Sequence, residues 1–335
     1  MATIEIPAAK ISFECPPGDT ILRAGLRAGL GMAYECNVGS CGNCQFELLE
    51  GKVESLYPEA PGLNERMRQR NRHLGCQSLA LTDCKIKLPM RDDYKSLILP
   101  ARATGHLTAI ENLTHDIREF RFRLDKGNRF LPGQYGLIGV PGVVGARAYS
   151  YCNNTADGAE WHFQIKRMPN GKASTALFDQ LKVGDAVTLD GPYGNAYLRE
   201  DAPRDILCVA GGSGLSPMIS IARAFAASEK LKGRKLHFVY GGRSGRDLAG
   251  EAILRGLPGF GKTIFYYAAL SNPADDDNWT GRTGFVHEAV KDILGASLPE
   301  HEIYFAGPPP MTEAVMKMAI ENKVPVAQLH YDRFY

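Results

Sequence analysis

The stretch Cys36-Asn37-Val38-Gly39-Ser40-Cys41-Gly42-Asn43-Cys44 holds three cysteines, with four residues between the first two and two residues between the next pair. A fourth cysteine, Cys76, follows after 31 further residues. Gly39 and Gly42 lack Cβ atoms, so a tight loop can bring its backbone N–H groups close to the thiol sulfurs. Three thiols on one loop and a fourth from elsewhere in the chain predict a site that binds metal.

The spacing Cys-x4-Cys-x2-Cys, with a distant fourth cysteine, is typical of a plant-type [2Fe–2S] centre. Each iron takes a tetrahedral shell of sulfur, and two bridging sulfides fill half of each shell. The protein must then supply two thiolates for each iron. We therefore predict that Cys36, Cys41, Cys44 and Cys76 bind the cluster.

Two other uses of four cysteines fit the sequence less well. Structural zinc sites usually combine two close pairs of ligands, whereas this chain has a single Cys-x2-Cys pair. Disulfides are disfavoured because the chain opens without the basic and apolar regions of a secretory signal. The remaining cysteines are expected to be small buried hydrophobic residues. They are Cys15, Cys84, Cys152 and Cys208.

At 335 residues the chain is long enough for two or three domains. Its hydrophobic content of 44% and its charged content of 23% are ordinary for globular proteins. No run of about 18 apolar residues occurs, so we expect no membrane span. The net charge of +2 gives no reason to expect a nucleic acid as a partner. We expect a cytoplasmic monomer.

Three regions differ in their pattern of strands and helices. Residues 1–92 combine short strand candidates with a helix over Thr20–Ala28, capped by Asp19, which predicts a small α+β domain. Residues 101–199 contain many short strand candidates separated by turn signals, which is typical of an antiparallel barrel. Residues 203–335 alternate apolar strands with helices, which predicts a parallel sheet in an α/β domain.

In the third region a glycine-rich turn follows the first strand, with the sequence Gly211-Gly212-Ser213-Gly214-Leu215-Ser216-Pro217. Glycines let the backbone approach a phosphate, and the next helix offers free N–H groups. Two further loops, Tyr240–Arg243 and Ala306–Met311, are expected at the same edge of the sheet, which predicts a nucleotide crevice. We also expect a helix over Leu248–Leu254 and a last strand around Val324–Leu329.

In the second region Arg147-Ala148-Tyr149-Ser150 follows a glycine-rich turn, and Gly171-Lys172-Ala173-Ser174-Thr175 opens a single helix. An arginine can pair bidentately with a pyrophosphate, and Tyr149 offers a flat face for an aromatic ligand. Taken singly, each feature has an ordinary explanation: a surface arginine, a core tyrosine and a capped helix.

Taken together and in this order, the motifs resemble those of the reductase components of bacterial multicomponent oxygenases. These proteins join a plant-type ferredoxin of the β-grasp fold to a flavin barrel and a nucleotide domain like those of ferredoxin–NADP⁺ reductases. Tyr34–Asn37, Pro58–Leu63, Gly284–Glu288 and Tyr331–Tyr335 look like toluene or alkene monooxygenase reductases. Ala306 departs from the family, which often has cysteine there.

The resemblance implies that electrons pass from NADH, less favourably NADPH, to FAD, then to the [2Fe–2S] cluster. The acceptor would be a di-iron monooxygenase that hydroxylates aromatic or alkene hydrocarbons, or a Rieske-type ferredoxin that serves the oxygenase. Ser150 would lie near flavin N5, and Phe334, or less favourably Tyr335, would cover the flavin face. The residues implied for FAD and nucleotide are Arg147, Tyr149, Ser150, Lys166, Gly171, Lys172, Ser174, Thr175, Gly211, Gly212, Ser213, Gly214, Gly307, Pro308 and Phe334.

Two alternatives remain at this point. The same redox chain could serve a ring-hydroxylating dioxygenase or an enzyme of deoxysugar synthesis. In the second alternative, the chain would be a non-catalytic scaffold with a structural metal and a degenerate flavin site. The intact Arg147–Ser150 motif argues against the scaffold.

Overall fold

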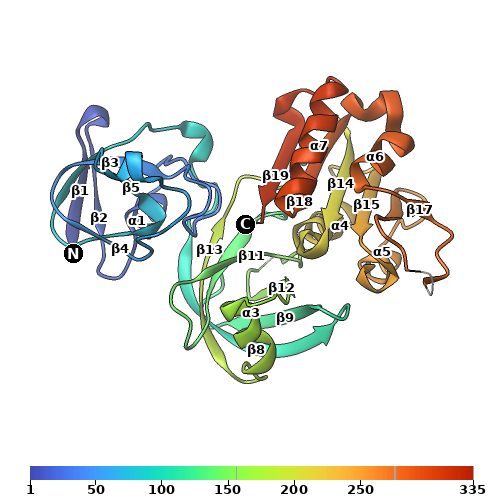
Figure 1. The fold of residues 1–335 in the computed structure, drawn as a ribbon, viewed down its shortest axis with the longest axis horizontal. Helices are drawn as coiled ribbons and strands as arrows, with labels where there is room; N and C mark the ends of the chain where they lie inside the picture. Colours follow the sequence, from blue (N-terminus) through green and yellow to red (C-terminus); the bar gives the residue numbers. More distant parts are fainter. Residues whose placement is uncertain (156, 275–276, 335) are drawn as a thin grey trace.

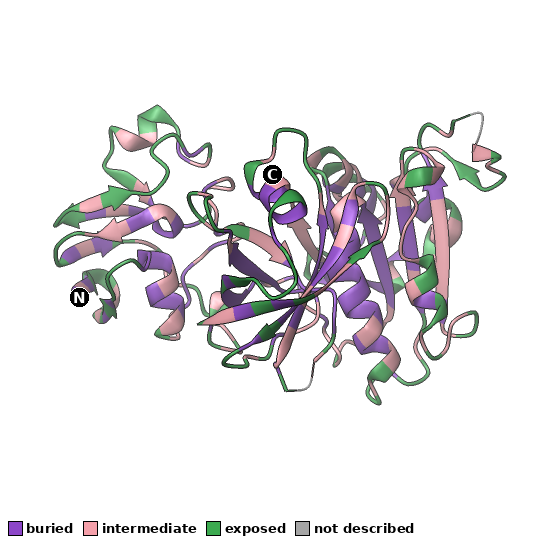
Figure 2. Cartoon of the chain, turned by 90° about the horizontal axis from the view of Figure 1, so that it is seen from below, coloured by how far each residue is buried: buried purple, intermediate pink, exposed green. Residues whose placement is uncertain are grey.

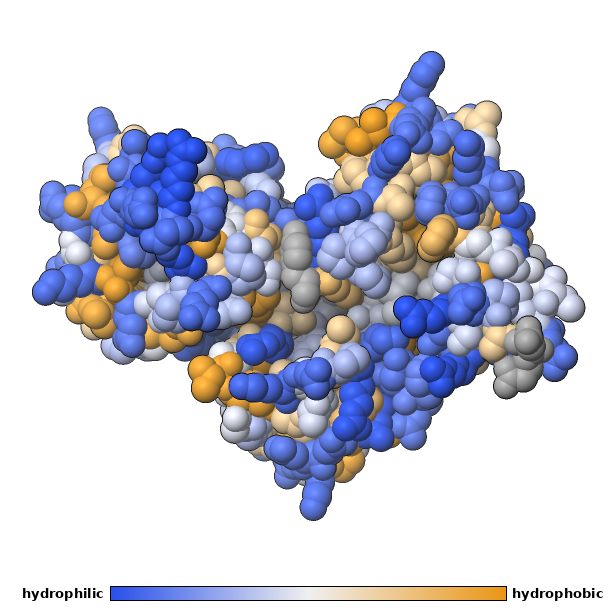
Figure 3. Space-filling model, viewed as in Figure 1, coloured by the Kyte–Doolittle hydropathy of each residue, from blue (hydrophilic) through white to orange (hydrophobic). Residues whose placement is uncertain are grey.

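The computed structural model describes residues 1–155, 157–274 and 277–334. Figure 1 shows three domains in chain order, with the first domain in blue and the third in yellow to red. In the space-filling view they form three lobes that meet around a central recess (Figure 3). No helix in the described part of the chain is both long and apolar enough to cross a membrane.

The first domain is a mixed five-stranded sheet with one main helix, as the α+β pattern predicts. The sheet order is β2-β1-β7-β3-β5; β1 runs parallel to β7, and the other pairs are antiparallel. These strands are β1 (Ala2–Ile6), β2 (Ile11–Cys15), β3 (Gln45–Glu50), β5 (Arg72–Leu74) and β7 (Cys84–Lys87). The other elements are α1 (Ile21–Arg27), α2 (Glu65–Arg68) and the small ladder of β4 (Val53–Ser55) with β6 (Ser78–Ala80).

The predicted cap of α1 was wrong. Thr20, not Asp19, is the N-cap residue, and its side chain accepts a hydrogen bond from the Arg23 N–H at 3.4 Å. The Asp19 carboxylate is instead paired with Arg27 and Arg102. A distant arginine therefore decides the role of a residue that local sequence alone assigns to the helix.

The second domain is a six-stranded antiparallel sheet that curls into a barrel. The order is β11-β10-β13-β8-β9-β12, and a single bridge from Tyr151 to Phe163 nearly joins the two edges. The strands are β8 (Ala101–Asn112), β9 (Ile117–Leu124), β10 (Tyr135–Gly139), β11 (Arg147–Ser150), β12 (Glu160–Lys166) and β13 (Ala186–Tyr193). Aromatic side chains fill the barrel, and the apolar face of α3 (Lys172–Asp179) packs against this core.

The third domain is a parallel sheet with an apolar core on each face. Its buried strands are purple in Figure 2. The order is β17-β16-β15-β14-β18-β19. The strands are β14 (Asp205–Gly211), β15 (Leu236–Gly242), β16 (Ile264–Leu270), β17 (Arg282–Thr283), β18 (His301–Gly307) and β19 (Leu329–Arg333). The helices are α4 (Leu215–Ala227), α5 (Glu251–Arg255), α6 (Val286–Leu294) and α7 (Pro309–Glu321).

Two expected elements of this domain differ from the structure. Helix α5 is shorter and begins later than Leu248–Leu254, because Gly250 adopts φ of +91° and ends the preceding turn. The last strand begins at Leu329, because Val326–Gln328 forms a 3-10 turn after Pro325.

Buried charges join the first domain to the barrel. Arg27 lies 2.9 Å from Asp19 of its own domain and 2.8 Å from Asp190 of β13. Arg102 of β8 lies 2.8 Å from Asp19, and the Tyr193 hydroxyl donates to Asp190. Both carboxylate side chains are less than a tenth exposed. Such pairs are costly to break from one side, because the partner left behind stays buried and uncompensated.

Arg27→Met should therefore loosen the docking of the first domain. We expect the free energy that holds the first domain on the barrel to fall by about 3 kcal/mol, because two buried carboxylates would then share only Arg102. Trypsin cleavage in the connecting segment 91–100 should then be faster by at least tenfold, because it tracks the open population. Lys85→Met is the matched control, since Lys85 pairs with Glu50 on the surface and such pairs contribute little. Equal cleavage rates for the two variants would contradict this account of the junction.

Candidate functional site

The four predicted ligand cysteines lie together, and they lie in two pairs. Cys41 lies beside Cys36 and Cys44 beside Cys76, and these neighbouring thiols lower the pKa of Cys36 and of Cys76. All eight cysteines of the chain are free thiols in this structure. Cys15, Cys84, Cys152 and Cys208 are buried, as predicted.

The arrangement in pairs distinguishes between one metal ion and two. In the described part of the chain no three of these sulfurs lie within 4.8 Å of one another. A tetrahedral zinc site with Zn–S bonds of about 2.3 Å would need all four that close. Two thiolates at each end of a longer site match a binuclear cluster instead. The donor set and its spacing therefore fit [2Fe–2S].

Backbone N–H groups already point at the sulfurs. The N–H groups of Ser40 and Cys41 lie 3.3 Å from Cys36 Sγ, and that of Asn43 lies 3.5 Å from Cys41 Sγ. Gly42 adopts φ of +80°, and a Cβ there would lie 2.7 Å from the Gly62 oxygen. The loop therefore needs this glycine. N–H donors stabilise the charged form of a cluster and help to set its potential.

The Arg147–Ser150 motif forms strand β11 at the edge of the barrel. Arg147 is exposed, and its Nη1 donates to carbonyl oxygens of the preceding turn. Tyr149 is partly buried against the barrel core, and burial raises its pKa to about 12. Ser150 is only 6% exposed. The predicted flavin residues therefore follow one another along a single edge strand.

The second predicted phosphate site is the start of α3. Gly171 is the N-cap, and a Cβ there would lie 2.6 Å from Ser174 Oγ. Ser174 is buried, and its hydroxyl accepts from the Met168 N–H and donates to the Gly171 oxygen. In this structure Ser174 shapes the turn, while the first N–H groups of the helix have no partner within the helix. Lys172 is exposed and Thr175 half-buried.

The nucleotide motifs converge where the strand order of the parallel sheet changes direction. Strands β14 and β18 are neighbours, and their carboxyl ends are Gly211 and Gly307. A Cβ on Gly214 would lie 1.9 Å from the Ala306 oxygen, so only glycine allows this approach. Gly212 adopts φ of +56°. Crevices at such switch points are where parallel sheets bind nucleotides. Ser213 lies in the 3-10 turn after β14, and exposed Pro308 directly follows β18.

Helix α4 attaches this crevice to the flavin strand. Three of its side chains, four and three residues apart on one helical face, donate to backbone carbonyls at and beyond the end of β11. The bonds are Ser216 Oγ to the Ser150 oxygen (2.6 Å), Ser220 Oγ to Asn153 (2.7 Å) and Arg223 Nη1 to Cys152 (2.7 Å). The glycine-rich turn and the flavin motif are therefore in direct contact.

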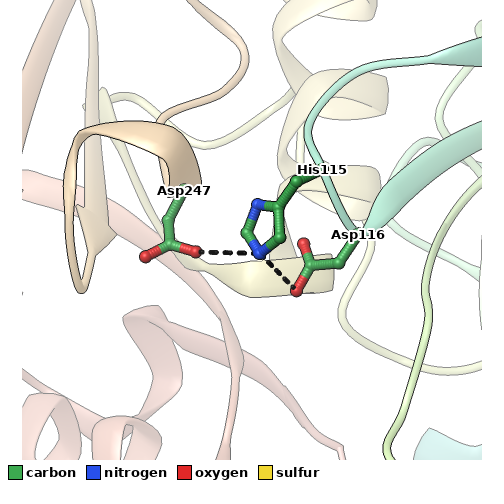
Figure 4. A group of neighbouring side chains, drawn as sticks. All are labelled: His115, Asp116 and Asp247. Atoms are coloured by element: carbon green, nitrogen blue, oxygen red, sulfur yellow. Dashed lines mark ion pairs between the residues drawn. The ribbon is translucent and has the colours of Figure 1, made fainter.

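Lys166 lies at the junction of the barrel and the nucleotide domain. Its Nζ is 2.7 Å from Asp116 Oδ2, and its stem lies beside Gly212. His115 Nε2 lies 3.5 Å from Asp116 and 3.8 Å from Asp247 of the nucleotide domain (Figure 4). These three groups have the proximity of metal ligands. Because the Lys166 ammonium already neutralises Asp116, we interpret them as an ion-pair junction.

The last strand brings the chain end to the same crevice. Strand β19 runs parallel to β18, so both end at the same edge of the sheet. The Phe334 N–H donates to the Gly307 oxygen at 3.3 Å, and its side chain packs on the core that includes Cys152 and Leu198. Tyr335 lies outside the described residues.

Sequence reasoning missed several residues that assemble this site. The 216, 220, 223 spacing on one helical face is visible in the sequence, but the carbonyls that it serves belong to another domain. Asp116 gave no signal at all. Cys152 looks like an ordinary core residue in the sequence and Ser220 like an ordinary helix residue. Nothing in the sequence indicates that both lie at the contact between the two domains.

Three family models match the chain in order. They are the 2Fe-2S iron-sulfur cluster binding domain over residues 4–81, the oxidoreductase FAD-binding domain over 104–197 and the oxidoreductase NAD-binding domain over 208–317. These matches show an FAD site, a nicotinamide nucleotide site and a [2Fe–2S] site. They contradict the reading of the chain as a non-catalytic scaffold.

Relatives are similar over nearly the whole chain. A ferredoxin–NAD(P)⁺ reductase of Metapseudomonas resinovorans is 40% identical and covers 96% of both chains. The reductase component of the alkene monooxygenase system of Xanthobacter autotrophicus is 37% identical, covering 96% of this chain and 98% of that one. The solved ferredoxin reductase of carbazole 1,9a-dioxygenase has a TM-score of 0.93 at 37% identity, covering 100% and 98%. The chain therefore belongs to the ferredoxin–NAD(P)⁺ reductases that serve as reductase components of multicomponent oxygenases.

Proposed function

We propose that this reductase donates its electrons to a di-iron monooxygenase that hydroxylates aromatic or alkene hydrocarbons, and that NADH is its preferred donor. The enzyme is an NAD(P)H-dependent flavin and iron–sulfur oxidoreductase that supplies an oxygenase system. The observation that supports the redox chain best is the Ser216–Ser150 hydrogen bond, because it joins the nucleotide turn to the flavin strand.

For several of the predicted residues, the position in the structure supports a role. Arg147 and the start of α3 would bind the FAD pyrophosphate, and Tyr149 would stack on the ring system. Ser150 would donate to the flavin from a carbonyl-anchored, buried position. When bound, FAD accepts two electrons from the nicotinamide, and the cluster accepts them one at a time. The remaining task of the protein is to fix these groups close together and away from water.

Two features bear on the choice of nucleotide. Asp247 lies after strand β15 at the crevice edge, and its carboxylate is held by the Ser244 N–H and hydroxyl. A fixed negative charge there disfavours the 2′-phosphate of NADPH. Arg243 and Arg246 are nearby cations that work in the opposite direction. We propose that the fixed Asp247 charge dominates.

A ring-hydroxylating dioxygenase is the second candidate for the oxygenase. The resemblance to the carbazole 1,9a-dioxygenase reductase, at a TM-score of 0.93, favours it. The relatives named for alkene, phenol and xylene or toluene monooxygenases favour the first candidate. In either case we propose that the reductase works as a cytoplasmic monomer, with a Rieske-type ferredoxin as the direct acceptor in the dioxygenase case.

The first prediction is that the redox halves can be separated. Cys41→Ser should remove the cluster, since a hydroxyl is a poor ligand for iron at neutral pH. NADH-dependent reduction of ferricyanide should survive, because the barrel and nucleotide domain have their own cores. Reduction of cytochrome c, of a purified di-iron hydroxylase and of a Rieske-type ferredoxin should all fall to background.

Cys84→Ser is the matched control. Cys84 is buried in the same domain, and its thiol donates only to backbone carbonyls, which a hydroxyl can also do. This variant should keep all four activities. Joint loss of ferricyanide and cytochrome c reduction in Cys41→Ser would contradict the modular mechanism. Faster reduction of the Rieske-type ferredoxin than of the hydroxylase by the intact protein, or a higher kcat/KM with NADPH, would count against the proposed partner or donor.

The second prediction concerns flavin retention. Arg147→Ala should weaken FAD binding by about 1.5–3 kcal/mol, the scale of one charge-assisted hydrogen bond. This corresponds to roughly a tenfold to hundredfold loss of affinity. FAD content after gel filtration measures it. Arg123→Ala is the control, because Arg123 is an exposed arginine that pairs with Glu160 on β12. Equal FAD content in both variants would argue against the role of Arg147.

The third prediction concerns the chain end. Phe334 lies beside Gly307 at the crevice, where it would cover the flavin face and move aside for the nicotinamide. Deleting residues 334–335 should raise NADH oxidation by O₂ without a partner and change the KM for NADH, because the cover excludes water and oxygen. Deleting only residue 335 is the control. A protein shortened by both residues that keeps its FAD and shows neither change would mean that the end only anchors β19.

A further inference from the structure

Tyr135 is a buried side chain that belongs to the barrel but reaches the cluster loop. It opens strand β10, where it lies opposite Ser150 of β11 on one side and Tyr193 of β13 on the other. Residues directly opposite in an antiparallel pair share a face of the sheet, with Cβ atoms about 5 Å apart. Tyr135 is therefore the lateral neighbour of Ser150, the predicted flavin contact.

The ring of Tyr135 is fixed on all sides. It is 4% exposed, and a Cβ on Gly194 would lie 3.0 Å from its Cδ1. The Tyr193 ring is tilted against it at 6.0 Å between centroids. Tyr135, Leu137 and Tyr193 of the barrel all join the apolar core of the first domain. The ring thus leaves the barrel surface and becomes part of the neighbouring domain.

The hydroxyl of Tyr135 ends at the cluster loop. It donates to the backbone oxygen of Glu35, the residue directly before the ligand Cys36. The Glu35 side chain in turn accepts from Asn43 Nδ2 at 3.0 Å, directly before the ligand Cys44. The Tyr135 side chain therefore holds the loop next to its first ligand, Cys36. The bond between Asn43 and Glu35 connects this position to the last ligand of the loop, Cys44.

A reciprocal bond holds the same junction from the other domain. The Tyr34 hydroxyl accepts from the Gly194 N–H of the barrel at 2.9 Å, and its ring meets Tyr193 edge-on. Each domain therefore sends one tyrosine hydroxyl to the backbone of the other. Such paired bonds resist sliding in both directions, which a shared apolar core alone does not.

We propose that Tyr135 is a positioning residue that fixes the cluster loop against the flavin strand, so that the electron passes over one short and constant distance. The inference rests on the proposed function, because it assumes that a flavin beside Ser150 reduces a cluster on Cys36, Cys41, Cys44 and Cys76. Electron transfer slows steeply as two centres separate. A hydrogen bond that limits the relative motion of the two domains therefore affects electron transfer from the flavin to the cluster. It leaves the oxidation of the nucleotide unchanged.

The test compares three tyrosine-to-phenylalanine variants of the full-length protein with FAD and cluster bound. Tyr135→Phe and Tyr34→Phe each remove one of the reciprocal bonds and keep the ring. Tyr151→Phe is the matched control, because Tyr151 is fully buried in the barrel and its hydroxyl has no hydrogen-bond partner in the described structure. Anaerobic stopped-flow absorbance separates flavin reduction by NADH from the later bleaching of the cluster.

We expect Tyr135→Phe to keep normal FAD and iron contents and a flavin reduction rate within about twofold of the wild type. Bleaching of the cluster should slow by about tenfold, which is less than the roughly hundredfold loss that a 1 Å misplacement can cause in an active site. Hydrogen exchange of the peptide covering residues 34–44 should rise by about threefold to tenfold, as expected for the loss of one buried hydrogen bond. Tyr34→Phe should change both readouts in the same direction, and Tyr151→Phe should change neither.

The outcomes separate this inference from the proposed function. Unchanged bleaching in Tyr135→Phe would overturn the positioning role. Slower bleaching with unchanged exchange would also overturn it, because Tyr135 would then act by some means other than placement. An equal effect in Tyr151→Phe would show a general response to losing a buried hydroxyl. A wild-type protein whose flavin is reduced but whose cluster never bleaches would overturn the proposed function itself.

Discussion

The contact of helix α4 with the end of strand β11 is the constraint on which the site depends. A barrel edge leaves carbonyl groups that need donors once another domain covers them. Ser216, Ser220 and Arg223 supply those donors from one face of the helix. Since α4 begins where the glycine-rich turn ends, satisfying the barrel edge also brings that turn to Ser150. The site is therefore placed by the need to satisfy backbone groups.

Strands β10 and β11 are consequently held from two directions. The nucleotide domain holds the end of β11 through α4, and the ferredoxin domain holds β10 through Tyr135 and the core that it enters. The barrel also has an aromatic interior of its own. A middle domain whose two neighbours contact adjacent strands suits a relay, because the order of the carriers follows the order of the contacts.

The sequence predicts what depends on local spacing and misses what depends on distant partners. The four cysteines and the glycines of the loop could be found because a cluster fixes both their type and their separation. The alternation of strands and helices also predicts the parallel sheet. Asp19 was assigned to a helix cap because one of its partners, Arg102, lies far along the chain. Tyr135 could not be found, since a tyrosine opening a strand is ordinarily a core residue.

Ser174 is a residue for which the sequence motif suggests a more direct role than the structure shows. Its place in a Gly-Lys-x-Ser motif suggests a phosphate ligand, yet its hydroxyl is occupied by the turn that starts α3. A motif residue can thus serve a ligand indirectly, by shaping the backbone whose N–H groups face it. The same reasoning applies to Gly214, where the missing side chain lets the turn after β14 approach the end of β18. Some residues of such a site bind a ligand with their side chains, and others, such as Gly214, are needed because they have no side chain. Only the structure distinguishes the two kinds.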